Sequence, residues 1–314
     1  MVPCRISVGR RHAENISRPT DDDGTGLGQT GGMSKPYAVV GSTGGQGGAV
    51  VDALFEKGLP VRALVRRRSA RSDALEQRGA EIVWTDITDR DATARAFEGC
   101  AGVFAMTTPF EDGPDAEVAQ GTALVDAMTS AAVPHVVFSS VADADKNTGI
   151  PHFETKARTE AVLRASSVPF TIVGPTYFYD NLLGGIDDIR RGRLDLPIPL
   201  DTPLQQLSRR DLGRFVALVL ADPTPFVGRR IDLASDDPTP RRMAEQLAAA
   251  LGTPVTAHSY SADSISSQDM AAMFGFLTST GYDADITQLR SDYPEVGWQS
   301  FSEWVFPEAQ QHRP

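Results

Sequence analysis

A glycine-rich segment directly after a short apolar run constrains the fold of this chain most strongly. The apolar run 38–40 stops at Gly41, two more glycines follow at three-residue intervals, Gly44 and Gly47, and a helical apolar pattern then begins. Glycines at such positions let the backbone approach a diphosphate closely, and the first N–H groups of the following helix point at its oxygens. The segment therefore predicts a strand, a phosphate-binding turn and a helix, in that order.

The next apolar run, 61–65, ends in three arginines, Arg66, Arg67 and Arg68. A domain that binds NAD usually places a carboxylate here for the ribose 2′-hydroxyl, whereas a guanidinium group suits a 2′-phosphate. We therefore predict NADP(H) as the cofactor, with Arg66 and Arg67 or Arg68 at its 2′-phosphate. The alternative is that these arginines form a solvated basic loop.

The glycine turn and the third apolar run supply further candidate contacts to this cofactor. Thr43 and Gln46 lie on the turn and are predicted to contribute backbone or side-chain contacts. Asp86 follows the run 81–85 and has two interpretations. It bonds the adenine amino group, with Ile87 packing on the ring, or it simply starts a turn or caps a helix.

Apolar runs and helical patterns alternate over residues 36–176. Short continuous runs linked by helices predict an α/β fold with a doubly wound parallel sheet of the Rossmann type. The pattern changes after residue 176, which predicts a smaller α+β domain over 177–314, some segments of which can return to the sheet. We expect strands at 37–40, 61–65, 81–85, 102–106, 135–139, 170–173 and 229–234, a loop at 196–199, and helices at 46–57, 73–78, 89–97, 115–132, 152–165, 209–222, 240–251, 268–280 and 285–291.

Composition limits the remaining possibilities. With 314 residues, 41% hydrophobic and 23% charged, the chain has an ordinary globular composition, and no apolar run approaches the ~20 residues that span a bilayer. Residues 1–35 are rich in Gly, Asp, Thr and Arg without periodicity, which predicts a disordered N-terminal extension. The net charge of −11 opposes direct binding to nucleic acid.

The cysteines and histidines indicate neither a disulfide framework nor a metal site. Only Cys4 and Cys100 are present, which fits a protein of the reducing cytoplasm. The five histidines show no metal-ligand spacing with these cysteines, so no metal is expected. The oligomeric state is left open by the sequence.

Seven segments, taken in order, resemble the NmrA-like family, a branch of the atypical extended short-chain dehydrogenase/reductases. The resemblance implies an NADP-binding Rossmann domain, placed here at 36–176, a smaller substrate or partner domain at 177–314, and a small-molecule substrate in the cleft between them. The segments are the turn 41–48, the strand end 61–68, residues 79–83 with Asp86 beyond, and residues 103–109, 136–140, 150–156 and 175–181.

The family resemblance implies one of two functions. Some members reduce quinones, dyes or other small carbonyl or conjugated compounds, and others are redox-sensing regulators that bind protein partners. The first expectation is an NADPH-dependent reductase that transfers hydride to a small, quinone-like compound. The alternative is a non-catalytic NADP(H)-binding sensor that acts through a protein partner.

The resemblance also carries three catalytic positions over to this chain. Ser140, His152 and Lys156 fall where Ser, Tyr and Lys lie in active short-chain dehydrogenases. Lys156 is expected to hold the ribose hydroxyls, and Ser140 is the third candidate. Because His152 replaces the usual proton-donating phenol, His152 or water would protonate the product. The alternative is that Lys156 is a solvated helix residue and His152 a neighbour of a helix N-cap.

Two segments that follow strands complete the predicted contacts. The first comes after the run 102–106 and is expected to line the nicotinamide ribose, because ligands bind at the carboxyl ends of the strands. The second follows the run 170–173, and its aromatic rings either floor the nicotinamide pocket and stack on a substrate or pack between domains. The residues concerned are Thr107, Thr108 and Pro109 in the first segment and Pro175, Tyr177 and Phe178 in the second.

Overall fold

The structure, a computed structural model, describes residues 34–108 and 113–305. The predicted N-terminal extension lies outside the described residues apart from Ser34 and Lys35, and Pro109 also lies outside them. The described residues form one compact unit. Within the described ranges, no helix has both the length and the apolar character needed to cross a bilayer.

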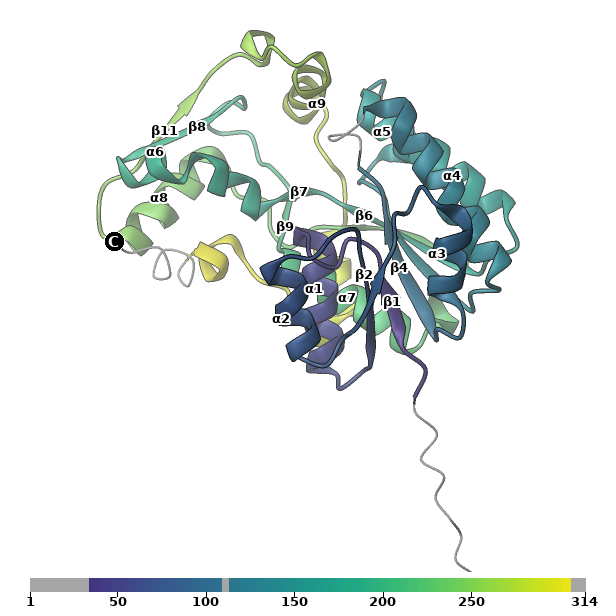
Figure 1. The fold of residues 1–314 in the computed structure, drawn as a ribbon. Coiled ribbons are helices and arrows are strands. Elements are labelled where there is room, and N and C mark those ends of the chain that lie inside the picture. Colours follow the sequence, from purple (N-terminus) through teal and green to yellow (C-terminus); the bar gives the residue numbers. More distant parts are fainter. Residues whose placement is uncertain (1–33, 109–112, 306–314) are drawn as a thin grey trace, which may run out of the picture. The chain divides into compact units, whose positions relative to one another are not determined.

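A seven-stranded sheet with every neighbouring pair parallel forms the centre of this unit (Figure 1). The strand order is β10-β6-β5-β4-β1-β2-β3. The direction of winding therefore reverses between β1 and β4, and a ligand crevice is expected at the carboxyl ends of those two strands. The predicted doubly wound sheet is confirmed, with strands β1 Tyr37–Val39, β2 Val61–Val65, β3 Glu81–Trp84, β4 Gly102–Met106, β5 Val136–Ser139, β6 Phe170–Pro175 and β10 Arg230–Leu233.

Helices cover both faces of the sheet. In Figure 1, α1 and α7 lie together on one face, and α3, α4 and α5 lie on the other. The predicted start of the second helix at Asp73 is wrong, because Ser69 and Ser72 form a reciprocal capping box that starts the helix at Ala70. The helices are α1 Gly45–Glu56, α2 Ala70–Gln77, α3 Arg90–Phe97, α4 Pro114–Ser130, α5 Pro151–Ala165 and α7 Arg209–Ala221.

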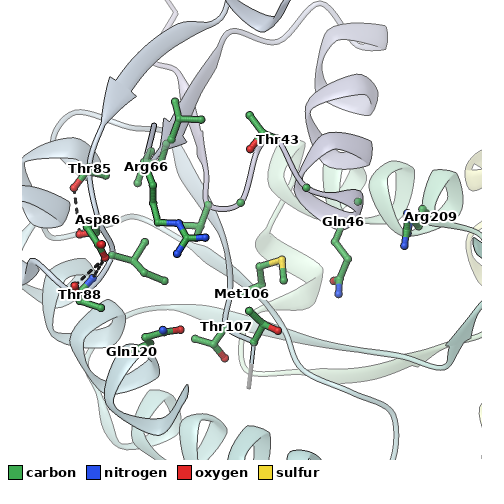
Figure 2. Close-up of a pocket in the computed structure, with 18 of the residues that line it drawn as sticks. Thr43, Gln46, Arg66, Thr85, Asp86, Thr88, Met106, Thr107, Gln120 and Arg209 are labelled. Atoms are coloured by element: carbon green, nitrogen blue, oxygen red, sulfur yellow. Dashed lines mark hydrogen bonds between the residues drawn. The ribbon is translucent and has the colours of Figure 1, made fainter. Parts of the chain in front are cut away.

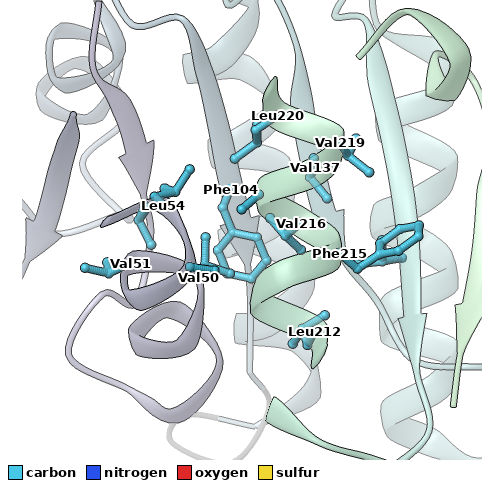
Figure 3. Packing of buried hydrophobic residues seen from close by; sticks show 14 of the residues in the cluster. Val50, Val51, Leu54, Phe104, Val137, Leu212, Phe215, Val216, Val219 and Leu220 are labelled. Atoms are coloured by element: carbon cyan, nitrogen blue, oxygen red, sulfur yellow. The ribbon is translucent and has the colours of Figure 1, made fainter. Parts of the chain in front are cut away.

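Alternate residues of the central strands pack on opposite faces of the sheet. In β4, Phe104 belongs to the cluster under α1 and α7, while Val103 and Ala105 belong to the cluster under the other helices. Figure 3 shows Phe104 next to Val50 between α1 and α7, with Val137 and Phe215 on the other side of α7. Because both faces are buried, the strands read as continuous apolar runs in the sequence.

The part of the chain after β6 builds a third apolar cluster beside the sheet. Its core includes Tyr179, Met243, Phe274 and Phe301, and Phe153 of α5 also packs into it. The predicted loop at 196–199 is wrong at its first residue, which ends strand β8. The added elements are strands β7 Tyr177–Phe178, β8 Arg193–Leu196, β9 Gln206–Leu207 and β11 Thr256–Ser259, and helices α6 Ile186–Arg190, α8 Pro240–Leu251, α9 Gln268–Ser279 and α10 Ile286–Asp292.

Candidate functional site

A cavity of about 440 Å³ lies over the glycine turn, at the carboxyl ends of β1, β2 and β4 (Figure 2). It stands where the strand order reverses, which is the expected position of a ligand crevice. The fold brings most of the predicted cofactor contacts together in this groove: Gly41, Thr43, Gly44, Gln46, Arg66, Asp86, Ile87, Thr107, Thr108 and Phe178 all line it.

The turn owes its shape to two of its glycines. Gly41 has a φ of +67°, in the left-handed region, and its carbonyl oxygen accepts a hydrogen bond from the Gly44 N–H at 2.8 Å. A Cβ on Gly47 would stand 2.3 Å from the Gly41 oxygen, so Gly47 lies behind the turn and not in the groove. The N-cap of α1, Gly44, supplies no side-chain hydrogen bond to the first turn of the helix. The N–H groups of that turn are therefore suited to an anion.

The arginines after β2 are divided between two environments. Arg66 lines the groove and also an adjoining cavity of about 250 Å³, which Arg67 and Arg71 line as well. Arg68 instead forms an ion pair with Asp73 at 2.9 Å. No carboxylate of the described residues lines this smaller cavity. Its chemistry therefore fits a phosphate group.

Asp86 is held by a turn of its own. Its Oδ1 accepts hydrogen bonds from the Thr88 N–H at 2.9 Å and the Thr88 hydroxyl at 2.8 Å. These two bonds, with a smaller contribution from the Arg66 charge, lower the pKa of Asp86. The geometry matches the interpretation of Asp86 as a residue that starts a turn, and its place in the groove wall leaves the adenine contact a prediction.

A second cavity, of about 430 Å³, adjoins the groove and contains the predicted catalytic positions. Ser140, His152 and Lys156 line it, together with Pro175 and Tyr177. Burial raises the pKa of Tyr177 to about 12. The later part of the chain adds an apolar side to the wall, with Met270, Met273, Phe274 and Tyr282. We call this space the chamber.

The groove and the chamber share a wall. Gln46, Met106, Thr107, Thr108 and Phe178 line both cavities. The Ser139 hydroxyl at the end of β5 donates to Gln46 Oε1 at 2.7 Å, which ties the start of α1 to this wall. A dinucleotide that lay in the groove with its adenine toward Arg66 would therefore reach the chamber with its other end.

Lys156 is buried in a compact polar network. Its ammonium contacts Glu117 Oε1 at 2.9 Å, the Thr107 carbonyl oxygen at 2.5 Å and the Thr107 hydroxyl at 3.1 Å. Glu117 also accepts hydrogen bonds from the hydroxyls of Thr107 and Thr155. Burial lowers the pKa of Lys156, and the Glu117 charge opposes that shift. The predicted alternative of a solvated Lys156 is excluded, but a ribose hydroxyl would have to displace one of these partners.

His152 and Ser140 also contact carboxylates. His152 Nδ1 lies 2.8 Å from Oδ1 of Asp269, which also accepts the His152 N–H at 3.1 Å. This contact joins the start of α5 to the start of α9. The Ser140 hydroxyl donates to Glu160, a buried residue of α5 that also pairs with Arg164.

Sequence reasoning missed several residues of the site. Asp269 and Glu117 are ordinary acidic residues of helical segments in the sequence, and only the fold brings them to His152 and Lys156. Arg71 and Gln120 were likewise missed. Arg209 lines the groove from the first position of α7. One signal was available for Arg209, because the glycine four residues later in its helix indicates a close helix crossing.

Three acidic residues that line neither cavity form a separate cluster. Oxygens of Asp143, Asp232 and Asp283 come within 4.8 Å of one another. Lys146 already bridges Asp143 at 2.8 Å and Asp283 at 2.5 Å, and Arg230 pairs with Asp232. The charges of Lys146 and Arg230 thus already offset the negative charge of this cluster.

The model of the NmrA-like family matches residues 33–305. The chain belongs to the NmrA-like family. One relative is the (4-alkanoyl-5-oxo-2,5-dihydrofuran-3-yl)methyl phosphate reductase of Streptomyces griseus, 30% identical over 69% of this chain and 74% of that protein. The photosystem II assembly factor Ycf39 of Cyanophora paradoxa is 26% identical, and the match covers 46% of this chain and 46% of Ycf39, about half its length.

Solved structures show the same fold in proteins of two kinds. The triphenylmethane reductase of Citrobacter sp., in complex with NADP(H), has a TM-score of 0.73 at 19% identity over 87% of this chain and 99% of that one. The negative transcriptional regulator NmrA, in complex with NADP, has a TM-score of 0.72 at 19% identity over 89% and 98%. The NmrA-like fold thus occurs in both an enzyme and a regulator, and the predicted cofactor is the one bound in these two structures.

Proposed function

We propose that this NmrA-like protein is an NADPH-dependent reductase that transfers a hydride to a small conjugated or carbonyl compound of the quinone type. The observation that carries the proposal is the wall shared by the groove and the chamber. A protein that only stored the dinucleotide would have no use for a largely apolar chamber at its reactive end. The reductase named among the relatives supports the same choice.

The residues of the groove fit NADP(H) along its length. Arg66 and Arg67 would hold the 2′-phosphate, since both line the smaller cavity at the end of β2 and a guanidinium group suits a phosphate. The N–H groups at the start of α1 would receive the diphosphate. Thr107, Thr108 and Phe178 would place the nicotinamide at the shared wall. The cofactor supplies the hydride, and the protein supplies position and field.

The chamber suits an apolar electrophile. The side chains of Met270, Met273 and Phe274 would exclude water from one side of a bound substrate. His152 lies in the chamber wall with its ring held by Asp269, where a proton is needed once hydride has been added to a carbonyl or quinone. His152 is therefore the proposed proton donor, directly or through water.

Turnover tests the proposal directly. The full chain is incubated with NADPH and a panel of quinones, an azo dye, a triphenylmethane dye and an enone, and the loss of reduced-nicotinamide absorbance is followed. Met270→Trp, which fills the chamber, should raise KM or abolish turnover while leaving NADPH affinity unchanged. Ala272→Trp, on the exposed face of the same helix, is the matched control. NADPH binding without turnover of any acceptor would exclude the reductase.

One observation favours the alternative of a non-catalytic NADP(H) sensor. Each of the three catalytic positions already contacts a carboxylate of the protein. His152 contacts Asp269, Lys156 contacts Glu117, and Ser140 donates to Glu160. A sensor would bind NADPH and NADP⁺ with different affinities and pass the difference to a partner protein. Calorimetric titrations with NADPH and with NADP⁺ test the sensor, because a protein with equal affinity for both forms could not report the redox state.

A further inference from the structure

Arg209, the first residue of α7, enters the groove beside the glycine turn. A Cβ built on Gly45 would lie 2.6 Å from Arg209 Cζ and 2.7 Å from its Nη1. The guanidinium group therefore fills the space that a side chain at position 45 would occupy. Figure 2 shows Arg209 and Arg66 on opposite sides of the turn, with Thr43 and Gln46 between them.

The packing of α7 on α1 fixes this position. Gly213 follows Arg209 by one helical turn, so both residues face α1. A Cβ on Gly213 would stand 2.2 Å from the carbonyl oxygen of Ala49, which in turn follows Gly45 by four residues. The two helices thus meet at matched positions, Gly45 with Arg209 and Ala49 with Gly213. Only this close approach lets the Arg209 side chain reach the phosphate-binding turn.

The guanidinium is held in place with part of its hydrogen-bonding capacity unused. Nη1 pairs with Asp180 Oδ1 at 3.3 Å, and the group stands 5.8 Å from the centre of the Phe178 ring. Nε of Arg209 and Oδ2 of Asp180 are buried and have no hydrogen-bond partner among the described residues. Burial raises the pKa of Asp180, and the Arg209 charge opposes that shift. A buried N–H without a partner is costly, and a bound anion would satisfy it.

We propose that Arg209 binds the diphosphate of NADP(H), facing the N–H groups of α1 from the α7 side of the groove. The inference rests on the proposed function only in the identity of the cofactor. The two arginines of the groove then have separate tasks. Arg66 would recognise the 2′-phosphate, which NADPH carries and NADH lacks, whereas Arg209 would bind a group that both cofactors share.

This division of tasks predicts a distinctive pattern of affinities. Arg209→Gln should weaken NADPH and NADH binding by the same factor, about 10- to 100-fold, because hydrogen bonds to a charged group are lost. The same variant should bind 2′-AMP as the parent does, because that ligand has no diphosphate. Arg66→Gln, the matched control at the other end of the groove, should weaken NADPH and 2′-AMP and leave NADH nearly unchanged.

The measurement is a fluorescence or calorimetric titration of each full-length variant with the three ligands, so it needs no substrate. Arg209→Gln leaves the partly buried Asp180 without a counter-charge, and the double variant Asp180→Asn/Arg209→Gln keeps the test open if the single variant does not fold. Unchanged affinity for NADPH and NADH in either folded variant would overturn the assignment, as would an equal loss for 2′-AMP. A parent protein that binds none of the ligands would overturn the proposed function itself, and the assignment with it.

Discussion

Replacing Lys156 by methionine is expected to destabilise the fold strongly, and in a way that depends on pH. The ammonium has three oxygen contacts and lies 2.9 Å from Glu117, whose side chain has no exposed surface. Removing one partner of a buried ion pair typically costs about 3–5 kcal/mol. Two threonine hydroxyls still donate to Glu117 in the variant, so the lower half of that range is expected.

Protonation sets an independent limit on this cost. An unpaired buried carboxylate can take up a proton, which for an ordinary glutamate costs about 4 kcal/mol at pH 7 and about 1.4 kcal/mol less for each unit of lower pH. The penalty of Lys156→Met should therefore be about 3–4 kcal/mol at pH 7 and shrink toward pH 5. The stability of the variant should fall as pH rises, because its folded state binds a proton more readily than its unfolded state.

Urea unfolding at pH 7, 6 and 5 measures the free-energy penalty and its pH dependence. The proteins compared are the parent, Lys156→Met, Glu117→Gln and the double variant. The double variant should recover most of the lost free energy, because no unpaired charge is left in the core. A penalty below about 1 kcal/mol at pH 7, or one that does not change with pH, would refute the buried ion pair. Lys156 would then be available for the cofactor contact that the sequence predicts.

Three further changes test other parts of the structure. Burial lowers the pKa of His135 from 6.5 to about 4, so the contribution of neutral His135 to stability is lost as pH falls from 6.5 to 4. His135→Gln should reduce the change in unfolding free energy over this pH range by up to about 3 kcal/mol, and an unchanged slope would contradict the shift. Arg66→Ala should lower the preference for NADPH over NADH at least about 10-fold in binding titrations, and a retained preference would move the 2′-phosphate site elsewhere. Gly213→Ala places a Cβ 2.2 Å from the Ala49 carbonyl and should cost about 1–3 kcal/mol or more in thermal melts, while an unchanged Tm would show that α1 and α7 are further apart.

The parts of the fold that depend on neighbouring residues were predictable from the sequence. The glycine turn, the strand before it and the helix after it follow from φ and close-approach requirements within about ten residues. The predicted start of α2 was wrong because Ser69 and Ser72 start the helix where the apolar pattern is weak. Such capping acts over a few residues but leaves no mark on hydrophobic periodicity.

The parts of the site that depend on distant residues were not predictable in the same way. Lys156 and His152 were identified by position, but their partners come from α4 and α9, 39 and 117 residues away along the chain. An acidic residue in a helix reads as a solvated one, because nothing local distinguishes Glu117 from its exposed neighbours. The predicted roles of these residues toward cofactor and substrate therefore stay predictions.

The return of α7 and β10 to the sheet divides the later part of the chain into two excursions, 177–208 and 234–305. Residues of both line the chamber, whereas the stretch between them belongs to the layer that carries the dinucleotide groove. Exchange of substrate preference between homologous proteins would accordingly need two separate grafts, one on each side of α7 and β10. A single crossover near residue 176 would also replace α7, and with it the arginine beside the turn.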